Sequence, residues 1–207
     1  MEHKYRITAG LIGGIGAFAL GAQVWMNLSR DGLGAGQTLW GLAAYFTILT
    51  NALMAASLLT IAATGRRLSF GWMTMLTMSM IVVGLVYHAL LAHLYHFTGL
   101  NWWTDQIFHT LMPALMLWFW LMESTRHPPR DGQPLLWLIW PAGYAVYALA
   151  RGWTTGWYPY PFLDVGALGA GAVAINIAGM VAGFAALGFA LRAIGQRMPL
   201  RNQLEAR

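Results

Sequence analysis

Residues 70–94 read FGWMTMLTMSMIVVGLVYHALLAHL and contain no Asp, Glu, Lys or Arg. About 20 mostly apolar residues are enough for an α-helix to cross the hydrocarbon core of a bilayer. Within that core a helix satisfies its own backbone hydrogen bonds, which an open chain cannot do. This stretch therefore predicts a transmembrane helix, and the rest of the chain can be compared with it.

The rest of the chain is also rich in apolar residues and poor in charged ones. Apolar residues make up 58% of the 207 residues and charged residues only 9%, whereas a soluble domain carries about 25% charged residues. We predict an all-α polytopic membrane protein with six transmembrane helices, in which residues 1–207 form a single integral membrane domain. The six predicted spans are approximately Thr8–Leu28, Leu39–Ala62, Phe70–Leu94, Thr104–Met122, Leu135–Ala150 and Val165–Leu191.

The basic residues predict the orientation of these spans. Ten of the twelve Lys and Arg residues fall on one side of the six-span arrangement, and only Arg30 and Arg151 fall on the other. Because the more basic side of a membrane protein faces the cytoplasm, we predict cytoplasmic termini and a cytoplasmic loop over Glu123–Pro134. The net charge of +5 then reflects topology and predicts no nucleic-acid partner. We expect a multi-pass plasma-membrane protein, which in a bacterium means the inner membrane.

Small residues are frequent in the first and last predicted spans. Gly13 and Gly16 are examples in the first, and Gly179 and Gly183 in the last. Such residues let transmembrane helices approach closely, within one chain or between copies, so the oligomeric state stays open. The chain has no cysteine, which excludes disulfides and cysteine-based metal sites.

Polar residues at membrane depth are the candidates for function, because each needs a partner or a cavity. Thr47 lies eight residues into the second predicted span, roughly 12 Å deep at 1.5 Å per residue. Asn51 follows four residues later and shares its helix face. A purely structural role is the alternative, with Thr47 bonded to its own helix backbone and Asn51 bonded to a neighbouring helix.

The fourth predicted span begins with a second pair. Asp105 and His109 are four residues apart, so they share a face of the helix. A carboxylate beside a histidine orients the ring and raises its basicity. His88 lies near the outer end of the third span. By depth, these residues and Thr47 fall in the outer half of the membrane.

A hydroxyl, a histidine and a carboxylate are the parts of a nucleophile–base–orienter set. In this interpretation His109 takes the proton of Thr47, Asp105 holds the ring, and Asn51 donates to the oxyanion. The substrate would be a lipid ester that enters sideways from the bilayer. Three alternatives stay open: a metal site that uses the outer histidines and Asp105, a haem held by His88 and His109, and a non-enzymatic transporter or structural protein.

Three motifs, taken together in order, resemble a known family. They are Tyr45-Phe-Thr47-Ile-Leu-Thr-Asn51, then His109, and then the loop Tyr158-Pro-Tyr160-Pro-Phe162. The chain resembles the androgen-induced family of multi-pass membrane proteins and its bacterial six-helix relatives. Animal members of that family are threonine hydrolases that cleave fatty acid esters of hydroxy fatty acids.

The resemblance implies specific roles. It implies that Thr47 is the nucleophile and His109 the base of a lipid ester hydrolase that needs no metal and no other cofactor. An extension of it is that Arg151 engages the free carboxylate of such a substrate. We predict that the substrate pocket is lined by outer polar residues, namely His88, Arg151, Tyr158, Tyr160 and Asp164.

Overall fold

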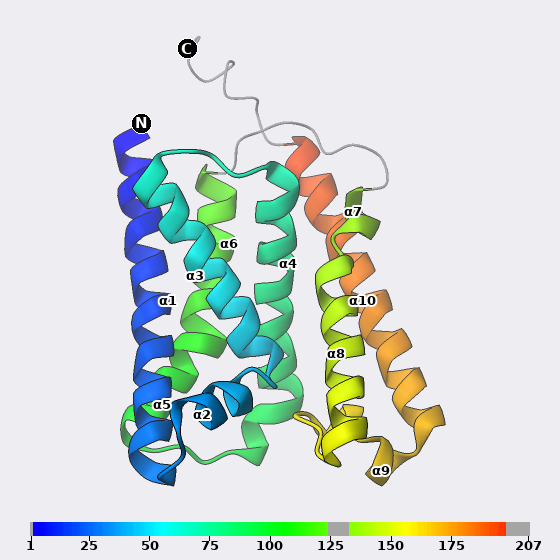
Figure 1. Ribbon diagram of the computed structural model, residues 1–207. Coiled ribbons are helices and arrows are strands. Elements are labelled where there is room, and N and C mark those ends of the chain that lie inside the picture. Colours follow the sequence, from blue (N-terminus) through cyan, green and yellow to red (C-terminus); the bar gives the residue numbers. More distant parts are fainter. Residues whose placement is uncertain (1, 124–132, 198–207) are drawn as a thin grey trace. The chain divides into compact units, whose positions relative to one another are not determined.

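The computed structural model describes residues 2–123 and 133–197. The chain forms two compact units, residues 1–125 and 126–207, and each is described by itself. Every regular element in the described ranges is helical (Figure 1). The all-α prediction is confirmed, and the prediction that the two units form one membrane domain stays a prediction.

The first unit is built from four long helical segments with shorter pieces at one end. Its elements are α1 (Glu2–Asp31), α2 (Ala35–Leu42), α3 (Phe46–Thr64), α4 (Phe70–Val86), the π-helical turn η1 (Tyr87–Leu91), the 3-10 turn η2 (Ala92–Leu94), α5 (Gly99–Gln106), the π-helical turn η3 (Ile107–Leu111) and α6 (Met112–Glu123).

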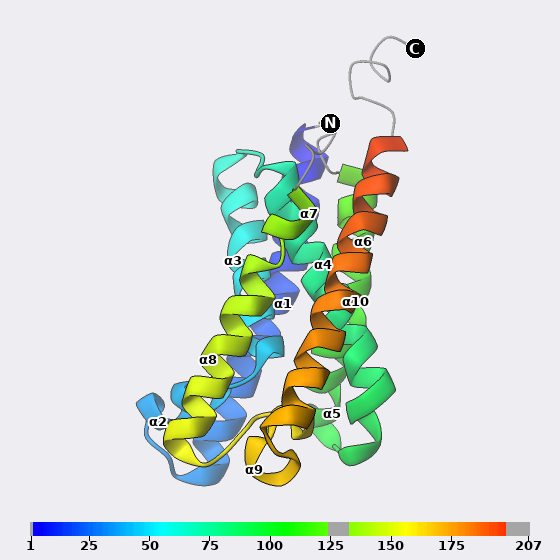
Figure 2. The same ribbon diagram turned by 90° about the vertical axis from the view of Figure 1, so that its right-hand side faces the viewer.

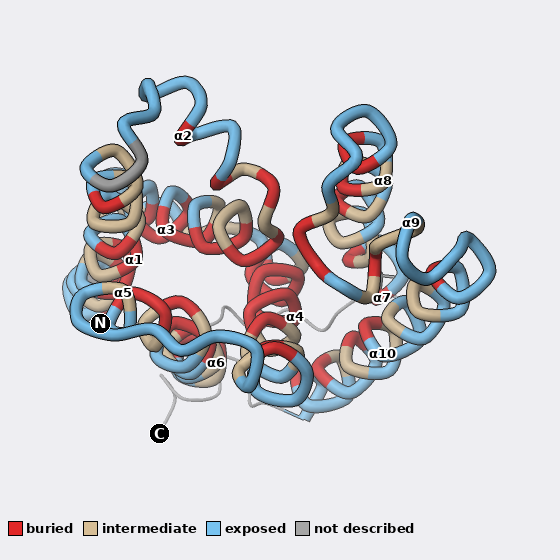
Figure 3. Tube along the Cα trace, turned by 90° about the horizontal axis from the view of Figure 1, so that it is seen from below, coloured by how far each residue is buried: buried red, intermediate tan, exposed pale blue. Residues whose placement is uncertain are grey.

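The four longer helices of this unit close into a ring. Helix α1 packs against α3, α3 against α4, α4 against α6, and α6 against α1. Seen along the bundle, the buried residues of these helices face a common interior (Figure 3). The short elements α2 and α5 lie at the end of the unit away from the N-terminus (Figure 1).

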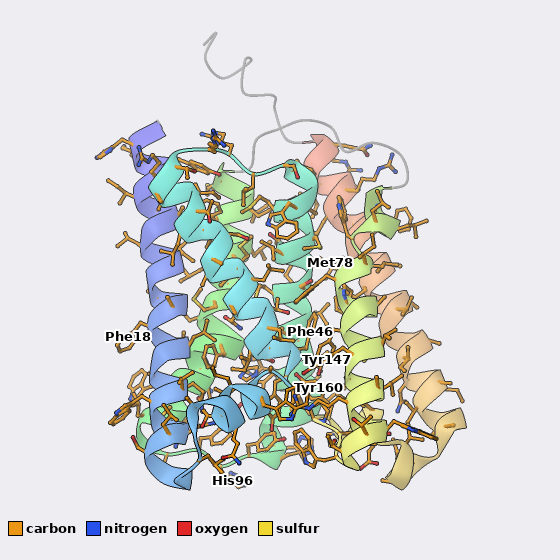
Figure 4. All side chains as sticks on the ribbon, viewed as in Figure 1. Phe18, Phe46, Met78, His96, Tyr147 and Tyr160 are labelled. Carbon is orange, nitrogen blue, oxygen red and sulfur yellow. The ribbon has the colours of Figure 1, made fainter. Side chains whose placement is uncertain are left out.

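The distribution of side chains in this unit is that of a membrane bundle. Threonine and asparagine side chains such as Thr50, Asn51 and Thr77 are fully buried. Large apolar side chains lie on the outside; Phe18 is 68% exposed and points away from the bundle (Figure 4). An interior that holds polar side chains among apolar ones, with an apolar exterior, is favourable where the surroundings are lipid.

Close packing of α1 on α3 depends on glycine. A Cβ atom at Gly13 would lie 3.0 Å from the Leu59 side chain and 3.1 Å from its backbone nitrogen. At Gly16 it would lie 3.1 Å from Met112 and 3.3 Å from Ala55. The predicted role of small residues is confirmed at Gly13 and Gly16, whereas a Cβ atom at Gly14 or Gly21 would meet no heavy atom within 4 Å in the described part of the chain, its own helix backbone aside.

The predicted second span is interrupted. Helix α2 ends at Leu42, a turn follows, and Tyr45 is extended with φ −94° and ψ 129° before α3 begins at Phe46. The prediction of one continuous helix over Leu39–Ala62 is therefore wrong. Thr47 lies in the first turn of a new helix, so its depth cannot be counted from Leu39.

Four helical segments in the described ranges are long and apolar enough to cross a membrane. They are His3–Ser29, Phe46–Thr64, Phe70–Leu94 and Ala170–Arg197. The fourth and fifth predicted spans, Thr104–Met122 and Leu135–Ala150, lie on helices that are not among these four. Several apolar helices thus support a membrane protein, and the count of six and the cytoplasmic termini stay predictions.

The second unit consists of two longer helices and a folded connection. Its elements are α7 (Gln133–Leu136), α8 (Ile139–Thr155), the 3-10 turn η4 (Pro161–Leu163), α9 (Val165–Leu168) and α10 (Ala170–Arg197). Figures 1 and 2 show α8 and α10 as the two long helices of this unit, and α10 contacts α7, η4 and α9. A Cβ atom at Gly179 or Gly183 of α10 would meet no heavy atom within 4 Å in the described part of the chain, its own helix backbone aside. Close packing within the unit therefore does not explain these two glycines.

Two predicted cytoplasmic segments fall mainly outside the described residues. Most of the loop Glu123–Pro134 lies there, as does the tail beyond Arg197. Their predicted location is therefore not tested.

Candidate active site

Polar side chains of the first unit gather around two π-helical turns. The turn η1 continues α4 and begins with Tyr87 and His88, whereas η3 joins α5 to α6 and carries His109. Each is closed by a backbone bond that spans five residues, from Ala92 N to Tyr87 O and from Met112 N to Ile107 O. Single π-helical turns inside helices occur frequently at functional sites.

The distortion at η3 has a reason in the sequence. Pro113 has no N–H to donate to the carbonyl of His109 one turn earlier, and its ring crowds that carbonyl. The wider π-helical turn accommodates the proline. Gly84 of α4 leaves room for the same carbonyl, because a Cβ there would lie 3.1 Å from His109 O. Pro113 is the sequence signal that could have predicted the irregularity.

Thr47 and His109 meet across this part of the bundle. Thr47 Oγ1 lies 3.3 Å from His109 Nε2, although the two residues are 62 positions apart. Thr47 is 8% exposed and the His109 side chain 15%. A hydroxyl and an imidazole nitrogen at this distance are within reach of proton transfer, and such contacts are often long in the absence of substrate.

Asp105 holds the other side of the imidazole. His109 Nδ1 lies 3.1 Å from Asp105 Oδ1 and 3.0 Å from the Asp105 backbone oxygen. Both partners accept, so Nδ1 carries the hydrogen and Nε2 is left as the acceptor for the Thr47 hydroxyl. The predicted pairing of Asp105 with His109 is present, and the order of groups is hydroxyl, imidazole, carboxylate.

Tyr87 supports both members of that pair. Its ring stacks on the His109 ring with centroids 3.9 Å apart and planes 15° from parallel. Its hydroxyl donates a hydrogen bond to Asp105 Oδ2. Tyr87 is buried, so one side chain fixes the imidazole plane and the carboxylate together. Sequence reasoning did not assign it a role, since its position relative to His109 depends on how α4 packs on α6.

A second histidine–threonine contact lies beside the first. His88 Nε2 is 3.0 Å from Thr110 Oγ1. Thr110 Oγ1 in turn donates to Gln106 Oε1 over 3.1 Å, and Gln106 Nε2 donates to Asp105 Oδ2 over 3.3 Å. Since Thr110 gives its only hydroxyl hydrogen to Gln106, His88 must donate to Thr110.

Asn51 is buried and bonded to its own helix. Its Nδ2 donates to the backbone oxygen of Thr47 over 2.9 Å, which confirms that the two residues share a face. Its Oδ1 is buried and has no hydrogen-bond partner within the described part of the chain. The structure thus shows a contact to the backbone of Thr47, and the predicted donation to an oxyanion stays a prediction.

The start of α3 brings other donors to the site. The first hydrogen bond of this helix runs from Leu49 N to Tyr45 O, and Tyr45 gives no side-chain cap. The N–H groups of Thr47 and Ile48 precede that bond, so neither has a partner within the helix. A helix N-terminus favours negative charge, and Thr47 stands in its first turn.

The other predicted pocket residues lie in the second unit. Arg151 is buried in α8 and its Nη1 donates to Tyr147 Oη over 2.9 Å. Tyr158 packs its ring where a side chain at Gly152 would be. Asp164 accepts a hydrogen bond from Ala167 N over 3.0 Å and caps α9.

Tyr160 is buried and stacks on Phe162, with centroids 5.1 Å apart. The loop is tied to α10, because Asn176 Nδ2 donates to Phe162 O over 2.9 Å. These contacts explain why the loop is ordered. Arg151, Tyr158, Tyr160 and Asp164 belong to the second unit, whereas Thr47 and His109 belong to the first. The assignment of these four residues to the substrate pocket therefore stays a prediction.

The metal alternative requires several ligands at one point. Among the described residues, no group of three or more His, Asp or Glu side chains is placed so that it could hold a metal ion. Asp105 and His109 are paired with each other and with Tyr87 and Thr47 instead.

Comparison with known proteins adds no identification. No protein-family model, no curated protein and no solved structure matches this chain. The interpretation of the site therefore rests on its geometry and on the sequence motifs.

Proposed function

We propose that this protein is a membrane lipid ester hydrolase in which Thr47 is the nucleophile and His109 the general base. One observation carries the proposal: Thr47 Oγ1, His109 and the Asp105 carboxylate are linked in that order, 3.3 Å and 3.1 Å apart. The residues come from α3, η3 and α5. A weak nucleophile, an adjacent base and a group that orients the base form the pattern of covalent catalysis.

Acylation follows from this order of groups. Thr47 Oγ1 attacks the ester carbonyl carbon while His109 Nε2 takes the hydroxyl proton. The imidazolium that forms is stabilised by Asp105. When the tetrahedral intermediate collapses, the bond to the leaving alcohol breaks and His109 returns the proton to that oxygen. The products of this half are an alcohol and an acyl ester on Thr47.

Deacylation repeats the steps with water. His109 takes a proton from water, the hydroxide oxygen attacks the acyl carbon, and the Thr47 oxygen leaves and recovers its proton. Negative charge develops on the carbonyl oxygen in both halves. The N–H groups of Thr47 and Ile48 at the start of α3 are the donors that we assign to it; removal of one such donor typically costs about 10²–10³ in kcat.

The substrate class follows from the surroundings of the site. The bundle exposes apolar side chains over its outer surface, so an ester with long acyl chains partitions into the same environment. The family resemblance points to fatty acid esters of hydroxy fatty acids. In that case the free carboxylate needs a cationic partner, and Arg151 remains the candidate.

The test is turnover in lipid nanodiscs with a panel of long-chain esters, including esters with and without a free carboxylate. We expect acid release by wild type, reduced but measurable release by Thr47→Ser, and none above background by Thr47→Ala. Serine keeps a nucleophilic hydroxyl, so its partial activity separates chemistry from folding. Equal activity of wild type and Thr47→Ala would contradict the proposal.

A further inference from the structure

A cavity of about 300 Å³ opens beside Asp105, in the first unit. It is lined by residues of η1, η2, the segment that follows η2, and α5, and neither Thr47 nor His109 is among them. Its volume is at the lower end of the range for small-molecule pockets, roughly 300–1,000 Å³. His96, at the lower end of the unit in Figure 4, is one of its lining residues.

Aromatic rings make up much of the wall. Tyr87, Tyr95, Phe97 and Trp102 all line the cavity. The Tyr95 and Phe97 rings are stacked, 5.5 Å apart and 6° from parallel. Aromatic faces carry a negative electrostatic potential and attract cations, and this attraction is strongest for tryptophan.

The charged side chain in the wall of the cavity is negative, like the electrostatic potential of the aromatic faces. Among the described residues, Asp105 is the only acidic one that lines the cavity, and no Lys or Arg does. Asp105 is 7% exposed. Its carboxylate contacts His109, Tyr87 and Gln106, and the residue lines the cavity. His88 donates its Nε2 hydrogen to Thr110, so that nitrogen is not directed at a ligand. Such a wall disfavours anions.

We propose that this cavity binds an organic ammonium group, held by the aromatic rings and by the charge of Asp105. A tetraalkylammonium or primary ammonium on a small carbon stem suits the combination, because the rings replace its hydration with apolar contact and cation–π attraction. Two sources share this chemistry: the headgroup of a zwitterionic lipid and a free amine. The site borders the proposed catalytic carboxylate but does not depend on hydrolysis.

The first experiment measures binding of radiolabelled tetramethylammonium to the full chain in a neutral maltoside detergent by equilibrium dialysis. We expect saturable binding, at least about fivefold weaker in Trp102→Leu and weakened also in Phe97→Leu. The matched control is Trp103→Leu, because Trp103 contacts Trp102 edge-on but does not line the cavity. Thr47→Ala should bind like wild type, so failure of the hydrolase proposal and failure of this one are distinguishable.

The second experiment tests whether charge is recognised. The neutral isostere 3,3-dimethylbutan-1-ol should compete at least about tenfold less well than choline. Equal competition, no saturable binding, or equal losses in Trp102→Leu and Trp103→Leu would each overturn the proposal.

A third experiment in lipid nanodiscs identifies the source of the ammonium group. Loss of free-cation binding in phosphatidylcholine nanodiscs but not in phosphatidylglycerol nanodiscs assigns the site to a lipid headgroup. Retention of binding in both assigns it to a free amine.

Discussion

The two π-helical turns of the first unit each carry a histidine that contacts a threonine hydroxyl from another element. In η3, His109 meets the hydroxyl of Thr47; in η1, His88 meets the hydroxyl of Thr110. The second contact is the shorter, 3.0 Å against 3.3 Å. Distance alone would therefore favour His88 and Thr110 over the pair that we propose as catalytic.

The direction of the hydrogen bonds separates the two pairs. His109 donates its Nδ1 hydrogen to Asp105, so its Nε2 is free to accept a proton from Thr47. Thr110 gives its hydrogen to Gln106, so His88 is the donor in its own contact. A donor cannot act as the base for the same hydroxyl. The comparison teaches that the carboxylate, more than the histidine–threonine contact, marks the candidate active site.

The strongest test of this comparison exchanges each threonine for its near-isostere valine. Thr47→Val should lower ester turnover by about 10³-fold or more, because the nucleophile is lost. Thr110→Val should cost about threefold at most, through a small disturbance of Gln106. The measurement is kcat/KM for a long-chain ester in nanodiscs. Losses of similar size in both variants would break the distinction.

The next test compares the histidines. His109→Gln should lower turnover by about 10²–10⁴-fold, the usual contribution of a general base. His88→Gln keeps a side-chain donor for Thr110 and should cost about fivefold or less. Thermal unfolding of both variants serves as the control for folding. A larger effect at His88 would mean that the active pair has been assigned to the wrong turn.

Asp105→Asn tests the role of the carboxylate. An amide can donate to His109 Nδ1 and so favour the hydrogen on Nε2, where it blocks acceptance from Thr47. We expect a loss of about 10²-fold or more by analogy with other triads. Gln106→Met removes a neighbouring donor to the carboxylate and the acceptor for the Thr110 hydroxyl, but it keeps the carboxylate, and it should cost much less. The ratio of the two losses, from kcat/KM, is the quantity to compare; a ratio near one would show that the carboxylate has no special role.

The smallest expected effect concerns Tyr87, which we assign as a positioning residue. Tyr87→Phe keeps the ring on His109 but loses the bond to Asp105, and we expect about a threefold to tenfold loss in kcat. Tyr87→Leu loses the stacking as well and should lose more, with KM little changed in both. If leucine and phenylalanine were equivalent, the stacking would have no role.

The spacing of residues along a helix was sufficient to predict part of this site. Four-residue spacing placed Asp105 beside His109 and Asn51 beside Thr47, and both contacts are present. The pairing of Thr47 with His109 joins residues far apart in sequence, and it was inferred from their similar depth, from the chemistry of the two groups and from the family resemblance. The partnership of Tyr87 with both His109 and Asp105 depends on the packing of α4 against α6, which no helical periodicity contains.

The fold, too, was predictable from the sequence only in part. Long apolar runs predicted helices, and the glycines of α1 predicted close packing that Gly13 and Gly16 confirm. The break before Phe46 was missed because residues 43–45, Ala-Ala-Tyr, contain neither proline nor glycine. That break is central to the chemistry that we propose, since it moves Thr47 from the interior of a helix to its first turn, beside N–H groups without an intrahelical partner.

The most direct measurement of the central claim is covalent labelling of the full chain with a fluorophosphonate probe, followed by mass spectrometry of the adduct. We predict an adduct on Thr47 in the wild type, absent from Thr47→Ala and strongly reduced in His109→Gln, with labelling of His88→Gln retained. An adduct on another residue, or no adduct on folded wild-type protein that turns over lipid esters, would contradict the assignment of Thr47 as an activated nucleophile.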